Sequence, residues 1–428
     1  MKISIIGAGS TYTPELVEGI IDRQKSLNVS ELFFYDIDME KLNIVGNLCK
    51  RMLLKANINI KAVLSDNLDD TLKDANFVLS QIRVGKLDAR ILDEKIPLEF
   101  GILGQETMGV GGFFKAQRTI PVVLDIVKKM EKLCPNSFYI NFTNPAGIIT
   151  QAISDNSFIK TIGLCNVPFN MIKSISEKMN LENPTFDYIG LNHLSWIVGI
   201  KDNNVDVFQK AIAEGINSDT MKNIGNSDFS AELIREIKAI PSPYLNYIYN
   251  IDEKLKKCYE EELSRGEKCK IIEKELLEKY KDENLNIKPP ELAERGGANY
   301  SLVAISLIDA IHNDKKEIHI VNCKNSGTVD FLDDKDVIET SCIIDSRGAT
   351  PIPLQNFNND NKYDHIVNLM KTFKEYENLT VKSAILKNKE LAIQSLCVNP
   401  LVKDKDTAIK VFNKLATAHK EFLPYDFL

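Results

Sequence analysis

The sequence predicts an α/β protein built on a mainly parallel sheet, followed by a C-terminal domain of mixed α+β structure. In the first 165 residues short β-type runs alternate with helical patterns, which is typical of parallel strands joined by covering helices. The chain of 428 residues is also too long for one ordinary hydrophobic core. We therefore expect a first domain over residues 1–165 and a second over residues 166–428.

Each expected element rests on its own run of residues. The predicted strands of the first half are Lys2–Ile6, Glu31–Asp36, Phe77–Gln81, Phe138–Phe142 and Thr161–Leu164. In the second half we expect strands at Phe186–Ile200 and Glu317–Asn322, an amphipathic helix over Lys254–Tyr280, a buried helix over Ser301–Ile311 and helical structure from Ala384 onward. The Asn, Asp and Ser content of two further stretches predicts loops at Asn217–Ser230 and Leu354–Asp364.

Composition and charge narrow the classes of partner. The formal net charge is −7, and Lys and Arg are scattered among Asp and Glu, so no basic field steers nucleic acid to the protein. No apolar run reaches the ~18–20 residues of a membrane span, and the chain starts directly with a strand rather than a secretory signal. The eight cysteines form no CxxC pair. We expect a cytoplasmic protein with small-molecule ligands and no nucleic-acid or membrane partner.

A phosphate-binding turn follows the first predicted strand. Gly7 permits a tight bend there, and Gly9 lets the backbone approach a pyrophosphate. The next helix begins beside Ser10 and offers oriented N–H groups and a positive dipole. Asp36 ends the second strand, where a carboxylate hydrogen-bonds an adenosine ribose and repels a 2′-phosphate. Although Tyr12 replaces the third glycine of the usual fingerprint, these residues predict a Rossmann-type domain that binds NAD rather than NADP.

Two further segments offer metal-binding side chains. Cys165 follows one predicted strand, and His193 ends another segment. A thiolate and an imidazole together suit a borderline divalent metal, although either residue alone is more often structural. Asn144-Pro145, in contrast, resembles a segment of the lactate and malate dehydrogenases. An NAD-dependent 2-hydroxy acid dehydrogenase is therefore an alternative function.

Taken together, the motifs resemble glycoside hydrolase family 4. They follow the family's order and are Gly7-Ala8-Gly9-Ser10, Tyr35-Asp36-Ile37-Asp38, Gly104-Gln105-Glu106-Thr107, Gly109-Val110-Gly111-Gly112-Phe113, Asn141-Phe142-Thr143-Asn144-Pro145-Ala146, Cys165-Asn166-Val167-Pro168, Gly190-Leu191-Asn192-His193 and Arg295-Gly296-Gly297. Asn166 resembles the 6-phospho-β-glucosidase subgroup, because 6-phospho-α-glucosidases usually carry Asp there and α-galactosidases His. Those two specificities are the alternatives within the family.

The resemblance implies a role for each motif. Cys165 and His193 would bind a manganese(II)-like ion that also contacts the sugar hydroxyls on carbons 2 and 3. Tyr244 would be the catalytic base, with Tyr247 and Tyr249 as close rivals. Since a free tyrosine has a pKa near 10, the base needs a nearby cation to ionise. Glu106 resembles the acidic residue that makes this tyrosine more basic.

Substrate binding should fall to residues near these motifs. Asn144 is expected to hold the sugar near the nicotinamide, and Asn166 to contact the substrate beside the metal. A guanidinium can grip a phosphate bidentately. The candidate phosphate ligands are therefore Arg90, Arg265 and Arg295, with Arg83 as a further possibility.

The implied reaction is NAD- and metal-dependent hydrolysis of 6-phospho-β-glucosides, such as cellobiose 6-phosphate, to glucose 6-phosphate and an aglycone. Unlike most glycosidases, this family does not rely on two carboxylates. It oxidises carbon 3 transiently, and elimination and addition then occur across carbons 1 and 2. We expect a homodimer or homotetramer, as is common in the family. A nucleotide-responsive binding protein without catalysis is a further alternative, since fold alone does not decide function.

Overall fold

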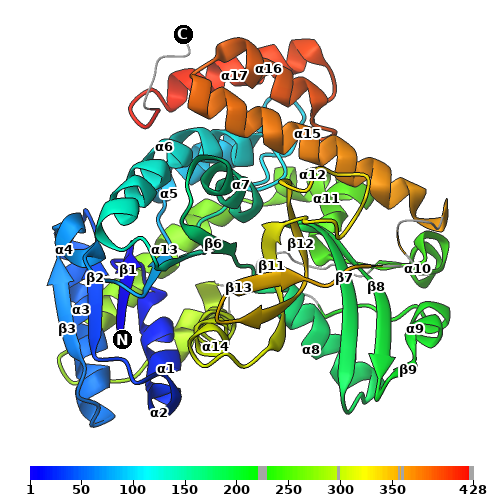
Figure 1. Ribbon diagram of the computed structural model, residues 1–428. Coiled ribbons are helices and arrows are strands. Elements are labelled where there is room, and N and C mark those ends of the chain that lie inside the picture. Colours follow the sequence, from blue (N-terminus) through cyan, green and yellow to red (C-terminus); the bar gives the residue numbers. More distant parts are fainter. Residues whose placement is uncertain (220–228, 296–298, 355–356, 358–360, 424–428) are drawn as a thin grey trace.

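The computed structural model describes residues 1–219, 229–295, 299–354, 357 and 361–423. Strands from both halves of the chain join in one sheet of thirteen strands within these residues, and helices cover both of its faces (Figure 1). No helix in the described ranges combines the length and the apolar character needed to cross a membrane.

The N-terminal half of the sheet is parallel. Its strands are β1 (Lys2–Ile6), β2 (Glu31–Tyr35), β3 (Lys61–Ser65), β4 (Phe77–Ser80), β5 (Phe138–Asn141) and β6 (Lys160–Gly163). They lie in the order β3-β2-β1-β4-β5-β6, and every neighbouring pair is parallel. This is the strand order of a Rossmann-type dinucleotide-binding fold, so the predicted fold class is confirmed.

Helices connect these strands on both faces of the sheet. They are α1 (Thr13–Asp22), α2 (Gln24–Leu27), α3 (Met39–Lys55), α4 (Leu68–Leu72), α5 (Lys86–Leu98), α6 (Val110–Leu133) and α7 (Ala146–Asn156). Two neighbouring residues of β4 show why the strands are apolar throughout. Val78 belongs to the core that α6 and α7 cover, whereas Leu79 belongs to the core that α1 and α3 cover.

Beyond β6 the sheet continues with antiparallel strands from the second half of the chain. These are β7 (Pro184–Leu191), β8 (Leu194–Asp202), β9 (Val205–Asp206), β10 (Ile240–Pro241), β11 (Glu317–Lys324), β12 (Val337–Asp345) and β13 (Gly348–Pro351). From β6 outward the order is β11, β12, β7, β8 and β10, while β9 pairs with β8 and β13 with β12. Asn322 of β11 pairs with Gly163 of β6, so the mixed second half is joined to the parallel half by sheet pairing.

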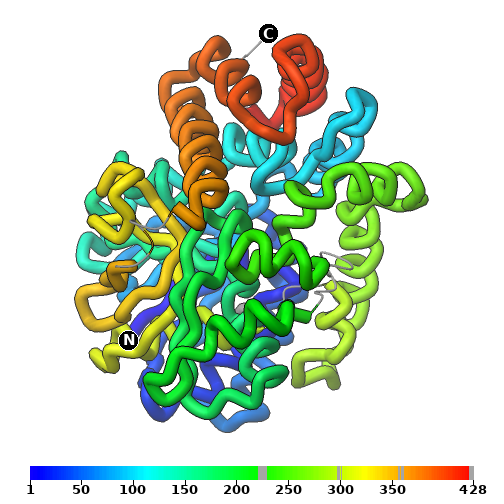
Figure 2. The backbone as a smooth tube through the Cα atoms, turned by 90° about the vertical axis from the view of Figure 1, so that its right-hand side faces the viewer, coloured from blue at the N-terminus to red at the C-terminus, as the bar shows by residue number. Residues whose placement is uncertain are grey.

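Several helices of the second half of the chain pack against helices of the first half. The helices of the second half are α8 (Val167–Met179), α9 (Phe208–Glu214), α10 (Ala231–Ile237), α11 (Asn246–Tyr249), α12 (Ile251–Glu260), α13 (Arg265–Tyr280), α14 (Tyr300–His312), α15 (Asp364–Leu386), α16 (Lys389–Val398) and α17 (Lys405–Ala418), with short 3-10 turns η1 (Pro243–Leu245), η2 (Pro290–Arg295) and η3 (Asn361–Tyr363). α13 and α17 pack on α5, and α14 packs on α1. Figures 1 and 2 show α15, α16 and α17 together at the end of the molecule where the C-terminus lies.

The single helix predicted over Lys254–Tyr280 is wrong. The structure has two helices here, α12 and α13, separated by residues 261–264. Ser264 starts the second helix with a capping box, because its side chain accepts the backbone N–H of Glu267 while the Glu267 carboxylate accepts the backbone N–H of Ser264. This local signal overrides the continuous amphipathic pattern.

Two other predicted boundaries also need correction. Phe186–Ile200 contains two strands, β7 and β8, rather than one strand region. The C-terminal helical region starts at Asp364, well before Ala384, and Ile366, Met370 and Phe373 form its buried face. Of the two predicted loops, residues 220–228, 355–356 and 358–360 lie outside the described residues.

Candidate active site

A cavity of about 670 Å³ lies at the carboxyl ends of the parallel strands. Its walls come from the turns that follow β1, β2, β4 and β5, where parallel sheets of this order bind their ligands. Several of the residues that the sequence singles out line this cavity. They are Gly7, Gly9, Ser10, Tyr12, Asp36, Arg83, Asn144 and Arg295.

The glycine turn after β1 is tied to the end of β2. Gly7 has a φ of +83°, and a Cβ atom there would lie 3.1 Å from the backbone of Gln81. The backbone N–H of Gly9 donates to Asp36 Oδ2 at 2.8 Å, and a Cβ atom on Gly9 would lie 2.9 Å from the same oxygen. Both positions therefore require glycine, because backbone and carboxylate approach too closely for a side chain.

His193 lies in the two-residue turn between β7 and β8. Its ring is buried and stacks on that of Tyr244, with centroids 3.6 Å apart and planes 8° from parallel. Burial lowers the pKa of His193 to about 3, so the ring is neutral. Its Nδ1 is buried and has no hydrogen-bond partner in the described part of the chain. A neutral imidazole with an uncommitted nitrogen is the form that binds a divalent metal.

Cys165 lies just beyond the end of β6 and is buried. Burial, together with the charge of Glu339, raises the pKa of its thiol. When it is ionised, Cys165 in turn raises the pKa of Tyr244, so the two side chains interact electrostatically. The described residues contain no cluster of three or more His, Cys, Asp and Glu side chains that could hold a metal. Among the described residues, Cys165 and His193 therefore remain the predicted pair, without a third His, Cys, Asp or Glu side chain clustered with them.

Tyr244 is the predicted tyrosine whose ring lies against His193. Burial, then the negative charges of Cys165 and Glu106, raise its pKa well above the ordinary value. The ring of Tyr247 lies 6.2 Å from that of Tyr244. The hydroxyl of Tyr249 instead accepts a hydrogen bond from the indole of Trp196 at 3.2 Å. Of the three tyrosines, Tyr244 therefore has the position that suits a base, and it needs a nearby cation to ionise.

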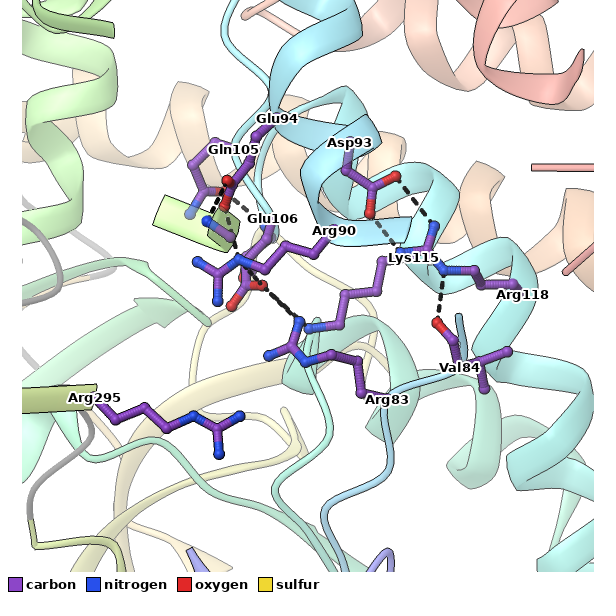
Figure 3. A network of polar contacts seen from close by, with 12 residues as sticks. Arg83, Val84, Arg90, Asp93, Glu94, Gln105, Glu106, Lys115, Arg118 and Arg295 are labelled. Atoms are coloured by element: carbon purple, nitrogen blue, oxygen red, sulfur yellow. Dashed lines mark hydrogen bonds and ion pairs between the residues drawn. The ribbon is translucent and has the colours of Figure 1, made fainter. Parts of the chain in front are cut away.

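Glu106 lies in the segment between α5 and α6 and faces three cations (Figure 3). Its Oε2 is 3.1 Å from Arg83 Nη1, 3.4 Å from Lys115 Nζ and 3.5 Å from Arg90 Nε. Burial alone would raise the pKa of Glu106, but Arg90, Lys115 and Arg83 outweigh burial and hold it well below the ordinary value. Glu106 is therefore a carboxylate at neutral pH, and its negative charge raises the pKa of Tyr244.

Lys115 is a charged residue of this cluster that the sequence analysis missed. It is almost completely buried on α6, and it also lines the cavity. Burial, and then the positive charge of Arg83, lower its pKa to about 7. The sequence did offer one indication that Lys115 is buried. This lysine directly follows the apolar pair Phe113-Phe114, in a stretch whose pattern is otherwise typical of a buried helix.

We expect Lys115→Met to change how stability depends on pH. The unfolded chain keeps the ordinary lysine pKa of 10.5, whereas the folded protein has about 7. Between these values the unfolded state binds more protons, so the stability contributed by Lys115 rises with pH. The wild-type protein should therefore gain in melting temperature relative to the Met variant as the pH rises from 7 toward 10.5. A constant difference across this range would contradict the expectation.

Two of the candidate phosphate arginines are already engaged by carboxylates. Arg90 Nε donates to Glu94 Oε1 at 2.7 Å, and both side chains are largely buried. Arg83 contacts Glu106 as described above. These two arginines therefore serve first to hold the acidic residues of the cluster.

Arg265 and Arg295 form a separate pair. Arg265 Nη2 donates to the backbone carbonyl of Arg295 at 2.5 Å. The Arg295 guanidinium lies 4.9 Å from the centroid of the Tyr12 ring and 3.2 Å from Glu273, and it lines the cavity. Figure 3 shows Arg295 apart from the Glu106 cluster. Arg83 and Arg295 are thus the candidate phosphate arginines that line the cavity, and Arg265 supports the backbone of Arg295.

The two candidate asparagines differ in position. Asn144 lines the cavity just after β5. Asn166 is buried at the N-cap of α8, next to Cys165. Asn144 therefore lines the cavity, whereas Asn166 is buried beside the cysteine and is not among the lining residues.

Glu339 on β12 is a second buried carboxylate that no sequence motif marked. Asn192 and Asn322 each donate to its Oε1 at 3.0 Å, and the Ser195 hydroxyl donates to its Oε2 at 3.2 Å. Burial raises the pKa of Glu339 to about 7, and these hydrogen bonds oppose that shift. Asn192 connects Glu339 to the turn between β7 and β8. The charge of Glu339 also raises the pKa of the Cys165 thiol. Its partners are far apart in the sequence, so their convergence is visible only in the fold.

Comparison with known proteins gives the family. The family 4 glycosyl hydrolase model matches residues 2–181, and the model of the family's C-terminal domain matches residues 188–402. This chain belongs to glycosyl hydrolase family 4. The family resemblance predicted from the motifs is therefore confirmed.

Relatives of known name match over nearly the full length. A probable 6-phospho-beta-glucosidase of Bacillus subtilis is 39% identical, with 100% of this chain and 98% of the relative covered. A 6-phospho-beta-glucosidase of Escherichia coli is also 39% identical, with coverage of 99% and 96%. A maltose-6′-phosphate glucosidase of Clostridium acetobutylicum is 28% identical, with coverage of 99% and 98%.

Solved structures of family 4 members and of other enzymes share the fold. The 6-phospho-beta glucosidase of Thermotoga maritima, solved with manganese, NAD⁺ and glucose-6-phosphate, is 35% identical and superposes with a TM-score of 0.88 over 99% of both chains. The malate dehydrogenase of Aeropyrum pernix is 15% identical, with a TM-score of 0.52 over 88% of this chain and 97% of that one. The second likeness concerns the fold alone, and it confirms the predicted dehydrogenase-like architecture.

Proposed function

We propose that this family 4 protein is an NAD- and divalent-metal-dependent 6-phospho-β-glucosidase. It hydrolyses 6-phospho-β-glucosides, such as cellobiose 6-phosphate, to glucose 6-phosphate and an aglycone. The observation that carries the proposal is the full-length match at 39% identity to relatives named for this β-specific activity, against 28% for the maltose-6′-phosphate glucosidase. Asn166 beside Cys165 supports the same specificity.

The turn after β1 suits the pyrophosphate of NAD. Gly7 and Gly9 leave no room for a Cβ atom, and they bring backbone rather than side chain to the wall of the cavity. The N-terminus of α1 follows directly and favours an anion. Asp36, held by the Gly9 N–H, stands where the adenosine ribose would lie. Gly7, Gly9, Ser10 and Asp36 are therefore assigned to NAD.

The side chains of His193 and Cys165 suit a divalent metal such as manganese(II). The unpartnered Nδ1 of the neutral His193 ring is a ready ligand. The Cys165 thiol would ionise beside a cation, because only burial and negative neighbours hold its pKa high. A thiolate and an imidazole are donors that borderline divalent metals accept.

The chain's own residues then act on the sugar. When bound, NAD⁺ supplies a hydride acceptor for carbon 3, and the metal supplies a Lewis acid for the resulting ketone. Tyr244 takes the proton from carbon 2 as a phenolate. Glu106, kept charged by its three cations, makes that phenolate more basic. Elimination of the aglycone from carbon 1, addition of water and return of the hydride to carbon 3 would complete the hydrolysis without net oxidation.

The proposal includes the arrangement of the whole protein. Residues 1–165 supply the NAD-binding domain, and residues 166–428 supply the substrate, metal and oligomer contacts. The protein acts in the cytoplasm as a homodimer or homotetramer. Light scattering of the purified protein measures the oligomeric state directly.

Hydrolysis of p-nitrophenyl 6-phospho-β-glucoside, with and without manganese, NAD⁺ and a reductant, tests the proposal. Activity should require both the metal and NAD⁺, without accumulation of NADH. Steady accumulation of NADH with a 2-hydroxy acid would favour a dehydrogenase instead. Faster turnover of the α-anomer or of an unphosphorylated α-galactoside would favour the other two specificities of the family.

Arg295→Met is expected to impair use of the phosphorylated substrate. Loss of a guanidinium that grips the phosphate should lower kcat/KM for the 6-phospho-β-glucoside far more than for any neutral β-glucoside. Arg347→Met is the matched control, because the Arg347 side chain is 81% exposed, and neither Arg347 nor its partner Asp345 is among the residues that line the cavity. Equal turnover of cellobiose and cellobiose 6-phosphate by the wild-type enzyme would refute the phosphate requirement.

A further inference from the structure

The far end of the chain reaches the cavity that we assign to NAD. Phe422, beyond α17, lines this cavity together with Gly85, which follows β4. Gly85 has a φ of +79°, and a Cβ atom on it would lie 3.3 Å from the Phe422 ring and 2.5 Å from the Ala89 side chain. The aromatic ring therefore packs against the open side of the glycine, in the wall of the cavity.

A buried ion pair fixes the glycine side of this contact. Arg118 pairs with the Asp93 carboxylate through both terminal nitrogens, and both side chains are almost fully buried. Its Nε donates to the backbone carbonyl of Val84 at 3.0 Å, as Figure 3 shows. Val84 directly precedes Gly85, so the hydrogen bond from Arg118 fixes the backbone of the turn after β4.

The same ion pair fixes the C-terminal side. His419 Nε2 lies 2.8 Å from Asp93 Oδ1, and the His419 ring is buried 5.7 Å from that of Phe114. The backbone carbonyl of His419 accepts the N–H of Phe422 at 2.8 Å. Because Asp93 is shared, the turn at Gly85 and the end of α17 are held in a fixed relation to each other.

The position of the contact indicates which part of NAD it meets. Lys86, next to Gly85, contacts Asp38 just beyond the end of β2, with Nζ 2.8 Å from Oδ2. The end of β2 is where this fold holds the adenosine ribose. Ile37 lies there and is 83% exposed, although it is large and apolar, and it lines the same cavity. The neighbourhood of Phe422 is therefore the adenosine end of the cavity.

We propose that Phe422 is an adenine-binding residue and that, with Ile37, it supplies apolar walls for the adenine ring of NAD. The inference rests on the proposed function, because it requires NAD in this cavity. A flat aromatic base would cover two apolar side chains that otherwise face water, and bases stack favourably on aromatic rings. The C-terminal segment thus belongs to the cofactor site, far in sequence from the glycine motif.

The test is calorimetric titration of the full chain and its Phe422→Ala variant with NAD⁺, ADP-ribose and nicotinamide mononucleotide. The variant should bind NAD⁺ and ADP-ribose roughly tenfold more weakly, as expected for loss of one stacking ring. Binding of the mononucleotide should be unchanged, and Phe422→Trp should retain the wild-type affinity for NAD⁺. Phe158→Ala is the matched control, since Phe158 is 68% exposed and lies outside the cavity lining.

The outcomes separate this inference from the proposed function. If the wild type binds NAD⁺ and Phe422→Ala binds it equally well, the inference is wrong and the proposed function stands. Equal weakening for the mononucleotide would also overturn it, because it would mean a general distortion. A wild-type protein that binds no NAD⁺ would overturn both.

Discussion

Tyr244→Phe is expected to lower kcat by roughly 10²–10⁴-fold, the usual cost of losing a general base. The phenol oxygen is the only atom group removed, and the Tyr244 ring can still stack on His193. Binding of NAD⁺ and manganese should therefore be retained. Steady-state kinetics with p-nitrophenyl 6-phospho-β-glucoside measure the loss in kcat. Titrations with NAD⁺ and with manganese measure whether binding of the two ligands is retained.

Tyr247→Phe is the matched control for this experiment. The Tyr247 ring lies 6.2 Å from that of Tyr244, and both side chains are partly buried in the same segment. Its variant should keep most of the activity. If Tyr247→Phe loses activity and Tyr244→Phe does not, the base is Tyr247 and the assignment from the stacked ring is wrong.

Cys165→Ser is expected to weaken manganese binding by more than the ~10–100-fold that follows loss of a residue behind a metal ligand. A serine hydroxyl does not ionise as a thiol does, so the site would lose a negative donor. Activity should fall with it and recover in part at high manganese concentration. Manganese titration followed by calorimetry and by activity measures both effects.

A second buried cysteine provides the control for Cys165. Cys49 is a buried residue of α3 and is not among the residues that line the cavity. Cys49→Ser should lower the melting temperature and leave manganese affinity unchanged. An unchanged manganese requirement in Cys165→Ser would mean that the metal binds elsewhere.

Local signals made much of the fold predictable. β1, the glycine turn and the start of α1 follow one another within a few residues, so the chain itself encodes that part of the cofactor site. Asp36 was predictable because it directly follows an apolar strand. Likewise, Cys165 and His193 stand in short motifs at strand ends, and the fold brings both to Tyr244.

What the sequence did not predict depends on contacts between distant segments. β12 was missed because Glu339, Thr340 and Ser341 interrupt its apolar pattern, and they are buried only because β7, β8 and β11 surround them. A lysine is usually predicted to lie on the surface. The burial of Lys115 depends on the packing of its helix against the segment that carries Glu106. β3 was missed as well, because its half-buried edge position leaves a weak pattern.

The most direct measurement of the proposed chemistry is the isotopic content of the product formed in D₂O. Elimination breaks the bond to hydrogen on carbon 2, whereas displacement by carboxylates leaves it intact. After many turnovers, with time for the Tyr244 phenol to exchange with solvent, the glucose 6-phosphate should carry deuterium at carbon 2. Glucose 6-phosphate that carries only hydrogen there, formed by enzyme that is active with NAD⁺ and manganese, would contradict the elimination route.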